Sequence, residues 1–222
     1  MTVDKKEING FDVVIAYDPD CESPRDGEHG CELALSHRRY DLADDSGYAS
    51  AFDDLNELET ALRAEFDVLY VAPVYGYDHG GIALRAGQRT GQFGDPWDSG
   101  LAGLAYVTRK NWEDTQGKGV RYSPKSSRDR ARAAALIDGD VEEYSRWLNG
   151  ECYGYTVTDP RDGEQVDSCW GFIGFEYAEQ AAREAAGSCE LEVKCSGRLN
   201  TRSGRIEHGA MPCPLHGEAV MS

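Results

Sequence analysis

The sequence contains no long apolar run and no stretch resembling a targeting segment. A membrane-spanning helix needs about twenty consecutive apolar residues, and no segment of the 222-residue chain approaches this. The first residues also lack a basic stretch followed by an apolar run, which is the pattern of a secretory signal peptide. We therefore expect a soluble, cytoplasmic protein without membrane contact.

Basic residues are scarce, with 23 Lys and Arg against 40 Asp and Glu, for a net charge of −17. A surface of this charge repels a polyphosphate backbone, so direct binding to DNA or RNA is not expected. Residues 101–135 reverse the balance, with 8 basic and 3 acidic side chains. We expect these cations to pair with carboxylates or to line a solvent-exposed helix, with phosphate binding as the alternative. They are Arg109, Lys110, Lys118, Arg121, Lys125, Arg128, Arg130 and Arg132.

The chain has seven cysteines, an odd number, and they are spread over 222 residues. The disulfide framework of a small secreted domain has a dense and even set, so it is not expected here. Residues 190–222 have few large apolar side chains, which predicts an irregular tail or small accessory element. The tail region offers one set of zinc ligands, namely Cys189, Cys195, Cys213 and His216, with His208 as a spare. The first spacing is wider than usual, so we prefer no cofactor and a tail with free thiols, with zinc as the alternative.

The remaining composition is globular, with 40% hydrophobic residues, four Trp and twelve Tyr. Strands and helices are mixed without strict alternation, which predicts one α+β domain over residues 1–189 with a mainly antiparallel sheet and about three helices. The expected strands are Phe11–Tyr17, Glu32–Ser36, Val68–Tyr75, Leu104–Thr108, Tyr153–Thr158 and Val166–Gly174, and the expected helices are Phe52–Phe66, Ser127–Leu148 and Glu176–Ala186. Tyr75, Trp97, Tyr153 and Trp170 are expected to be largely buried, and Cys169 to be a core thiol.

One segment combines an acid, an imidazole and glycines at the end of an apolar strand. Asp78 and His79 precede two glycines, and Asp98 follows in a second turn. A His with two carboxylates can bind a divalent metal or share a proton in catalysis. The alternative is a polar turn in which the two Asp side chains accept from backbone amides and His79 bonds to a carbonyl.

Several motifs occur in an order that resembles a known family: YDPDCESPRDG, SHRRYDLADD, VYGYDHGGI, PWDSGLAGLAYV, ECYGYTV and VDSCWGF. The chain resembles an uncharacterised protein family of bacteriophages and conjugative elements of Gram-positive bacteria, over roughly residues 15–175. The resemblance implies a mobile-element origin and a bacterial host, but no reaction. Family members usually have Ser at the position of Gly80 and Cys at that of Asp95, so a mechanism with either nucleophile could not operate here.

These observations lead to two hypotheses. The first is a non-enzymatic counter-defence inhibitor, of anti-CRISPR or anti-restriction type, that binds a host defence protein by acidic mimicry of nucleic acid. The alternative is a metal-dependent hydrolase of a phosphate ester or nucleotide that uses Asp78, His79 and Asp98, with Arg38 or Arg39 steering phosphate. Arg38 and Arg39 could instead neutralise Asp18, Asp20 or Asp41. The carboxylates expected to form the mimicking stripe are Asp41, Asp44, Asp45, Asp53, Asp54, Glu57 and Glu59.

Overall fold

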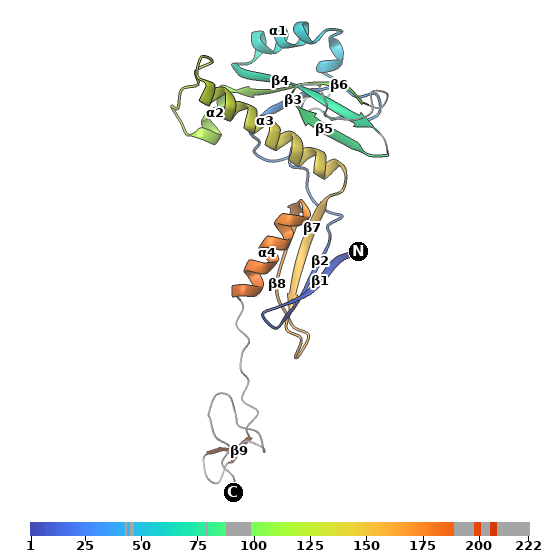
Figure 1. Ribbon diagram of the computed structural model, residues 1–222, viewed down its shortest axis with the longest axis vertical. Helices are drawn as coiled ribbons and strands as arrows, with labels where there is room; N and C mark the ends of the chain where they lie inside the picture. The colour runs from blue at the N-terminus through green and yellow to red at the C-terminus, as the bar shows by residue number, and fades with distance from the viewer. Residues whose placement is uncertain are drawn as a thin grey trace.

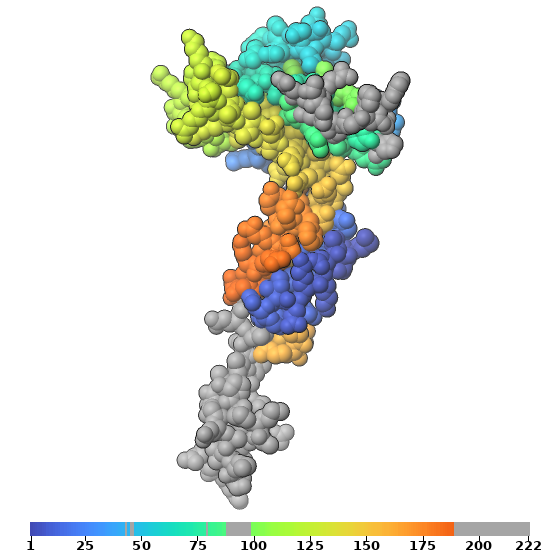
Figure 2. All heavy atoms as spheres, viewed as in Figure 1, coloured from blue at the N-terminus to red at the C-terminus, as the bar shows by residue number. Residues whose placement is uncertain are grey.

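Two antiparallel four-stranded sheets form the structure, a computed structural model, and each has its own helices and core (Figure 1). The structure describes residues 1–42, 44, 47–78, 80–87 and 99–188, and the backbone of two short strands at 198–200 and 205–207. The fold is a single α+β domain, as expected, in which the two sheets lie in successive lobes. Figure 2 shows the lobes stacked end to end, and Figure 1 shows that they meet near the end of the long yellow helix.

The upper lobe in Figure 1 contains the sheet of order β3-β6-β4-β5, which is covered on both faces. Leu33 and Leu35 of β3 pack with Ile137 and Val141 of α3, whereas Ala34, between them, packs against α1 on the other face. Because successive strand residues point to opposite faces, a sheet between helices needs apolar side chains on both faces. Its elements are β3 (Glu32–Leu35), η1 (Ala49–Ala51), α1 (Leu55–Glu65), β4 (Val68–Asp78), β5 (Ile82–Ala86), β6 (Ser99–Thr108), α2 (Arg109–Gln116) and α3 (Ser127–Leu148).

The lower lobe contains the sheet of order β1-β2-β7-β8, with α4 packed on one face. Phe11, Val13 and Ile15 alternate along β2 and meet the small side chains Ala178 and Ala182 of α4. The small alanines allow the helix to approach the large strand residues closely. The elements are β1 (Thr2–Ile8), β2 (Phe11–Tyr17), β7 (Cys152–Thr158), β8 (Gln165–Ile173) and α4 (Phe175–Ser188), followed by the pair β9 (Arg198–Asn200) and β10 (Arg205–Glu207).

The end of α3 connects the two lobes. Arg146 forms an ion pair with Glu176 of α4, and its guanidinium lies over the ring of Tyr177, 6.0 Å from the centroid. One residue further on, the Trp147 indole donates to the Cys21 carbonyl at 3.1 Å. Contacts of α3 with both lobes therefore join two otherwise separate hydrophobic cores.

Local signals explain where the expected elements agree with the structure. The bounds of α3 are those expected, because the Ser126 side chain caps its N-terminus and Gly150, with φ +72°, follows its last turn. The bounds of β2 also agree, whereas β4 runs three residues past the expected end at Tyr75. The sequence interpretation missed β1, β5 and the capped helix α2.

The expected burial of Trp170 and Cys169 was wrong, whereas Tyr153 is buried as expected. Trp170 is 47% exposed and Cys169 is an exposed thiol, because β8 is an edge strand. The β7–β8 register shifts between Tyr153 and Tyr155, opposite a positive-φ Gly171. This irregularity leaves Trp170 against Gly154 while Phe172 packs on the α4 core, so the two rings do not share a face.

Parts of the chain lie outside this description. Tyr75 is half-buried, and Trp97 is outside the described residues. The proposed boundary near residue 189 stays a prediction, and the side chains of Cys189, Cys195, Cys213 and His216 are likewise outside the described part. Of the helices that the structure describes, none combines the length and apolarity needed to cross a bilayer.

Candidate functional site

Asp78, the last residue of β4, lies in a pocket with cationic and imidazole groups. His37 and Arg38 belong to the loop after β3, and the side chain of the next residue, Arg39, also reaches Asp78. Their nitrogens lie 3.6 Å, 3.5 Å and 3.8 Å from Asp78 Oδ2, at ion-pair distances. The sequence interpretation left two roles open for Arg38 and Arg39, namely steering phosphate in one pocket with Asp78, or neutralising Asp18, Asp20 or Asp41. The structure places both guanidinium groups beside Asp78.

The Asp78 pocket has a volume of about 300 Å³. Its lining includes the apolar residues Ile82 and Leu84 of the sheet, together with Ser36 and Gly100. Asp78 Oδ2 is buried and has no hydrogen bond from the described residues. Its negative charge is balanced by the His37, Arg38 and Arg39 nitrogens at ion-pair distance rather than by a close hydrogen bond.

His37 is held in one tautomer. The backbone N–H of Arg39 donates to His37 Nδ1 at 3.2 Å, so the neutral ring carries its proton on Nε2. That nitrogen faces Asp78 Oδ2, and the ring stacks on Tyr40, with centroids 5.2 Å apart. His37 belongs to the cationic SHRRY segment, which sequence reasoning regarded as able to bind phosphate. Its pairing with Asp78 was missed, because the two residues are about forty positions apart.

The charge of the Asp78 pocket argues against metal ligation there. Two guanidinium groups face one carboxylate, which leaves a positive balance that repels a divalent cation. The other two residues of the hydrolase hypothesis, His79 and Asp98, lie outside the described residues. The described part of the site therefore favours an anionic or hydrogen-bonding ligand over a metal ion.

A second depression, the Asp53 groove, adjoins the Asp78 pocket. It has a volume of about 500 Å³ and includes Asp53 and Asp54 at the start of α1. The two depressions share Ser36, Leu101 and Ala102, and Leu101 is 48% exposed. The structure thus brings sequence-predicted cations and carboxylates to neighbouring hollows around one exposed leucine.

The expected carboxylate stripe is only partly available to a partner. Asp44 forms an ion pair with Arg25, and Glu59 with Arg63 one helical turn away. Asp54 caps α1 by accepting from the Asn56 N–H, and this backbone hydrogen bond lowers the pKa of Asp54.

The other carboxylates of that stripe have different positions. Asp53 and Glu57 are exposed near the N-terminus of α1, and Asp41 is exposed in the loop before η1. Asp45 is outside the described residues. The stripe is therefore reduced to a cluster at the start of α1, with Asp41 as a separate exposed acid.

The basic segment is also divided. Arg109 pairs with Asp67 and Lys110 with Asp114, whereas Lys118, Arg121 and the four further cations up to Arg132 are exposed.

Comparison with protein-family models, curated proteins and solved structures finds no match for this chain.

Proposed function

We propose that this chain is an accessory protein of a bacteriophage or other mobile element that inhibits a host defence system by binding a host protein. The observation that carries the proposal is the pair of adjoining hollows around Leu101, with exposed carboxylates at the start of α1. The motif resemblance to mobile-element proteins supports the proposed origin, and the net charge of −17 supports a positively charged partner.

The chemistry of this face selects a basic partner. Leu101 supplies an apolar contact at the centre, and Asp53, Asp54 and Glu57 lie together at one end of α1. Carboxylates arranged in this way accelerate association with a cationic surface, and the attraction weakens as salt screens it. Because Asp44 and Glu59 are neutralised within the chain, imitation of nucleic acid is carried by the α1 cluster.

The proposal is tested with the tagged full chain and a host lysate. A host protein recovered by co-purification and identified by mass spectrometry is then purified and titrated against the wild type and two variants. The first combines Asp53→Asn, Asp54→Asn and Glu57→Gln, where Asn at position 54 preserves the helix cap. The charge-matched control combines Glu22→Gln, Glu28→Gln and Glu143→Gln at exposed positions elsewhere.

We expect the identified partner to be a basic defence protein whose binding falls about tenfold or more in the α1 variant and in high salt, with the control unchanged. Equal losses of affinity in both variants would show that binding depends on the overall net charge and not on the α1 cluster. Tight binding of the wild type to duplex DNA in a mobility-shift assay would overturn the proposed class of partner.

A further inference from the structure

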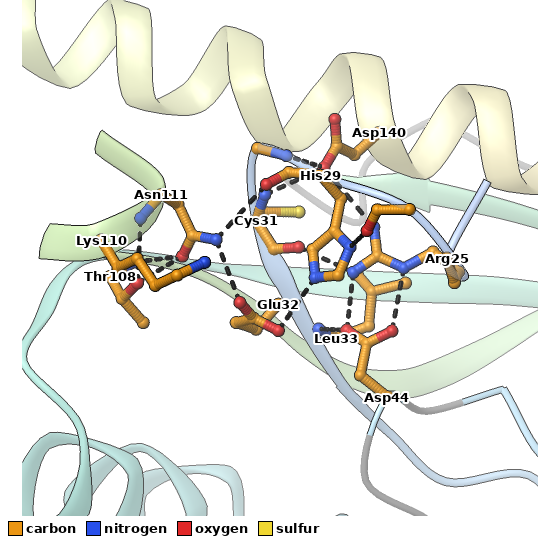
Figure 3. A network of polar contacts seen from close by, with 12 residues as sticks. Arg25, His29, Cys31, Glu32, Leu33, Asp44, Thr108, Lys110, Asn111 and Asp140 are labelled. Atoms are coloured by element: carbon orange, nitrogen blue, oxygen red, sulfur yellow. Dashed lines mark hydrogen bonds and ion pairs between the residues drawn. The ribbon is translucent and has the colours of Figure 1, made fainter. Parts of the chain in front are cut away.

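Three potential metal ligands meet at the other end of β3, away from the Asp78 pocket. His29 precedes the strand, Glu32 begins it, and Asp44 comes from the loop that follows (Figure 3). One ligand atom from each side chain lies within 4.8 Å of the other two. An imidazole and two carboxylates are a donor set that first-row divalent metals accept.

The hydrogen bonds of His29 leave a lone pair facing a carboxylate. Its Nδ1 lies 3.0 Å from the Gly27 carbonyl oxygen, which can only accept, so Nδ1 carries the proton. In the neutral ring Nε2 is then an acceptor, yet it lies 3.1 Å from Glu32 Oε2, which is also an acceptor. A cation between these atoms removes the repulsion. Either a proton or a metal ion can fill this role.

The two carboxylates are held in place by other groups. The Asn111 amide donates to Glu32 Oε1 at 3.0 Å, which leaves Oε2 turned towards His29. Asp44 accepts from both Nε and Nη2 of Arg25 and from the Leu33 N–H. Outer partners of this kind orient metal ligands and keep them in place before the ion binds.

The charge of the cluster favours a divalent cation. Asp44 and Asp140 contact the Arg25 guanidinium, and Glu32 lies beside His29, so three carboxylates share one guanidinium. The Arg25 side chain is only 9% exposed, and those of Asp44 and Asp140 are each 19% exposed. Charge in such a position is poorly solvated, so full compensation is favourable. A divalent cation adds two positive charges, which balances the excess of two carboxylates over the guanidinium.

The cluster also opens onto a groove, so ligands from outside the chain have access. Glu32 and Asp44 line this groove, which has a volume of about 570 Å³. Phe66 and Tyr106 form an apolar part of its wall, and the cations Arg109 and Lys110 also line it. With three protein ligands, a metal ion keeps open positions for water or an anionic oxygen on this side.

We infer that His29 Nε2, Glu32 and Asp44 bind a divalent cation of the Mn²⁺, Fe²⁺ or Zn²⁺ class. The site is separate from the α1 face and does not depend on the proposed function. Mixed imidazole and carboxylate ligation favours these metals over Ca²⁺, which takes oxygen ligands, and over soft ions, which prefer thiolates.

The inference is tested with Mn²⁺ alone and the full chain. Mn²⁺ is the suitable probe because the thiols of the tail region favour softer metals. Electron paramagnetic resonance of free Mn²⁺ measures binding in the wild type, His29→Ala and Glu32→Gln, with His37→Ala as the matched control. We expect one strong site per chain, weakened at least about tenfold in the first two variants, since even outer-shell substitutions have effects of this size. The control should bind as the wild type does.

A second measurement needs no substitution. On titration with Mn²⁺, the nuclear magnetic resonance signals of the His29 ring should broaden at lower Mn²⁺ concentration than those of the His37 ring, which lies farther from the site. Absence of a Mn²⁺ site in the wild type would overturn the inference, as would His29 signals that respond to protons but not to Mn²⁺. Binding that survives His29→Ala and disappears in Cys213→Ser would place the metal in the tail and would also overturn it.

Discussion

Replacement of Arg25 with Met tests how the loop after β2 is attached to α3. The Arg25 guanidinium donates to both carboxylate oxygens of Asp44, at 2.9 Å and 2.6 Å, and to the Cys31 carbonyl at 2.7 Å. A further nitrogen lies 3.4 Å from Asp140 of α3. Met retains much of the apolar stem and removes the charge, so the variant isolates the electrostatic contribution.

The expected cost follows from the burial of these groups. Removal of one partner of a buried ion pair costs about 3–5 kcal/mol, because the other charge is left unpaired. The side chains of Asp44 and Asp140 are each 19% exposed and keep backbone donors, from Leu33 and from Gly30 and Cys31 respectively. We therefore expect the lower limit, about 3 kcal/mol in the free energy of unfolding.

Urea unfolding of the full chain measures this cost, and a second variant checks its origin. Arg25→Met combined with Asp44→Asn leaves fewer unpaired charges, so it should be more stable than Arg25→Met alone by about 1 kcal/mol or more. If Mn²⁺ binds beside Asp44, it should stabilise Arg25→Met more than the wild type. A cost below about 1 kcal/mol for Arg25→Met would refute the reasoning, as would strictly additive effects of the two substitutions.

Other substitutions test the lower lobe and its junction. Trp170→Ala should cost about 2 kcal/mol in urea unfolding, about half of the 3–5 kcal/mol of a fully buried ring, since 47% of the residue is exposed; a cost above about 4 kcal/mol would contradict its placement. Gly154→Ala should shift the tryptophan emission maximum to longer wavelength, because a Cβ at position 154 would lie 2.1 Å from the Trp170 indole and displace it towards water; an unchanged emission maximum would contradict this contact. The hydrogen bond from Arg146 lowers the pKa of Glu176, so its stabilisation is present above the unfolded-state pKa and is lost as pH falls through the folded-state pKa. The melting temperature of Glu176→Gln should therefore fall less than that of the wild type between about pH 5 and pH 2. Equal slopes of melting temperature against pH would exclude a contribution from this pair.

Local sequence alone determined the elements whose signals lie within them. The bounds of α3 follow from the Ser126 cap and the glycine after its last turn, and β2 follows from the alternation of Phe11, Val13 and Ile15. The α+β class follows from the same periodicities. Helix capping and strand alternation involve residues a few positions apart, so they are legible without knowledge of the fold.

Tertiary structure decided the positions that depend on distant partners. Trp170 is exposed because β8 is an edge strand whose pairing shifts at the opposing glycine, and neither feature is visible in its alternating pattern. Arg38 contacts Asp78, which lies forty positions further along the chain. His29 meets Asp44 only because the loop after β3 returns to the strand. Burial, ion pairing and ligand geometry depend on which segments the sheets bring together, and non-local pairing of this kind has no local signal in the sequence.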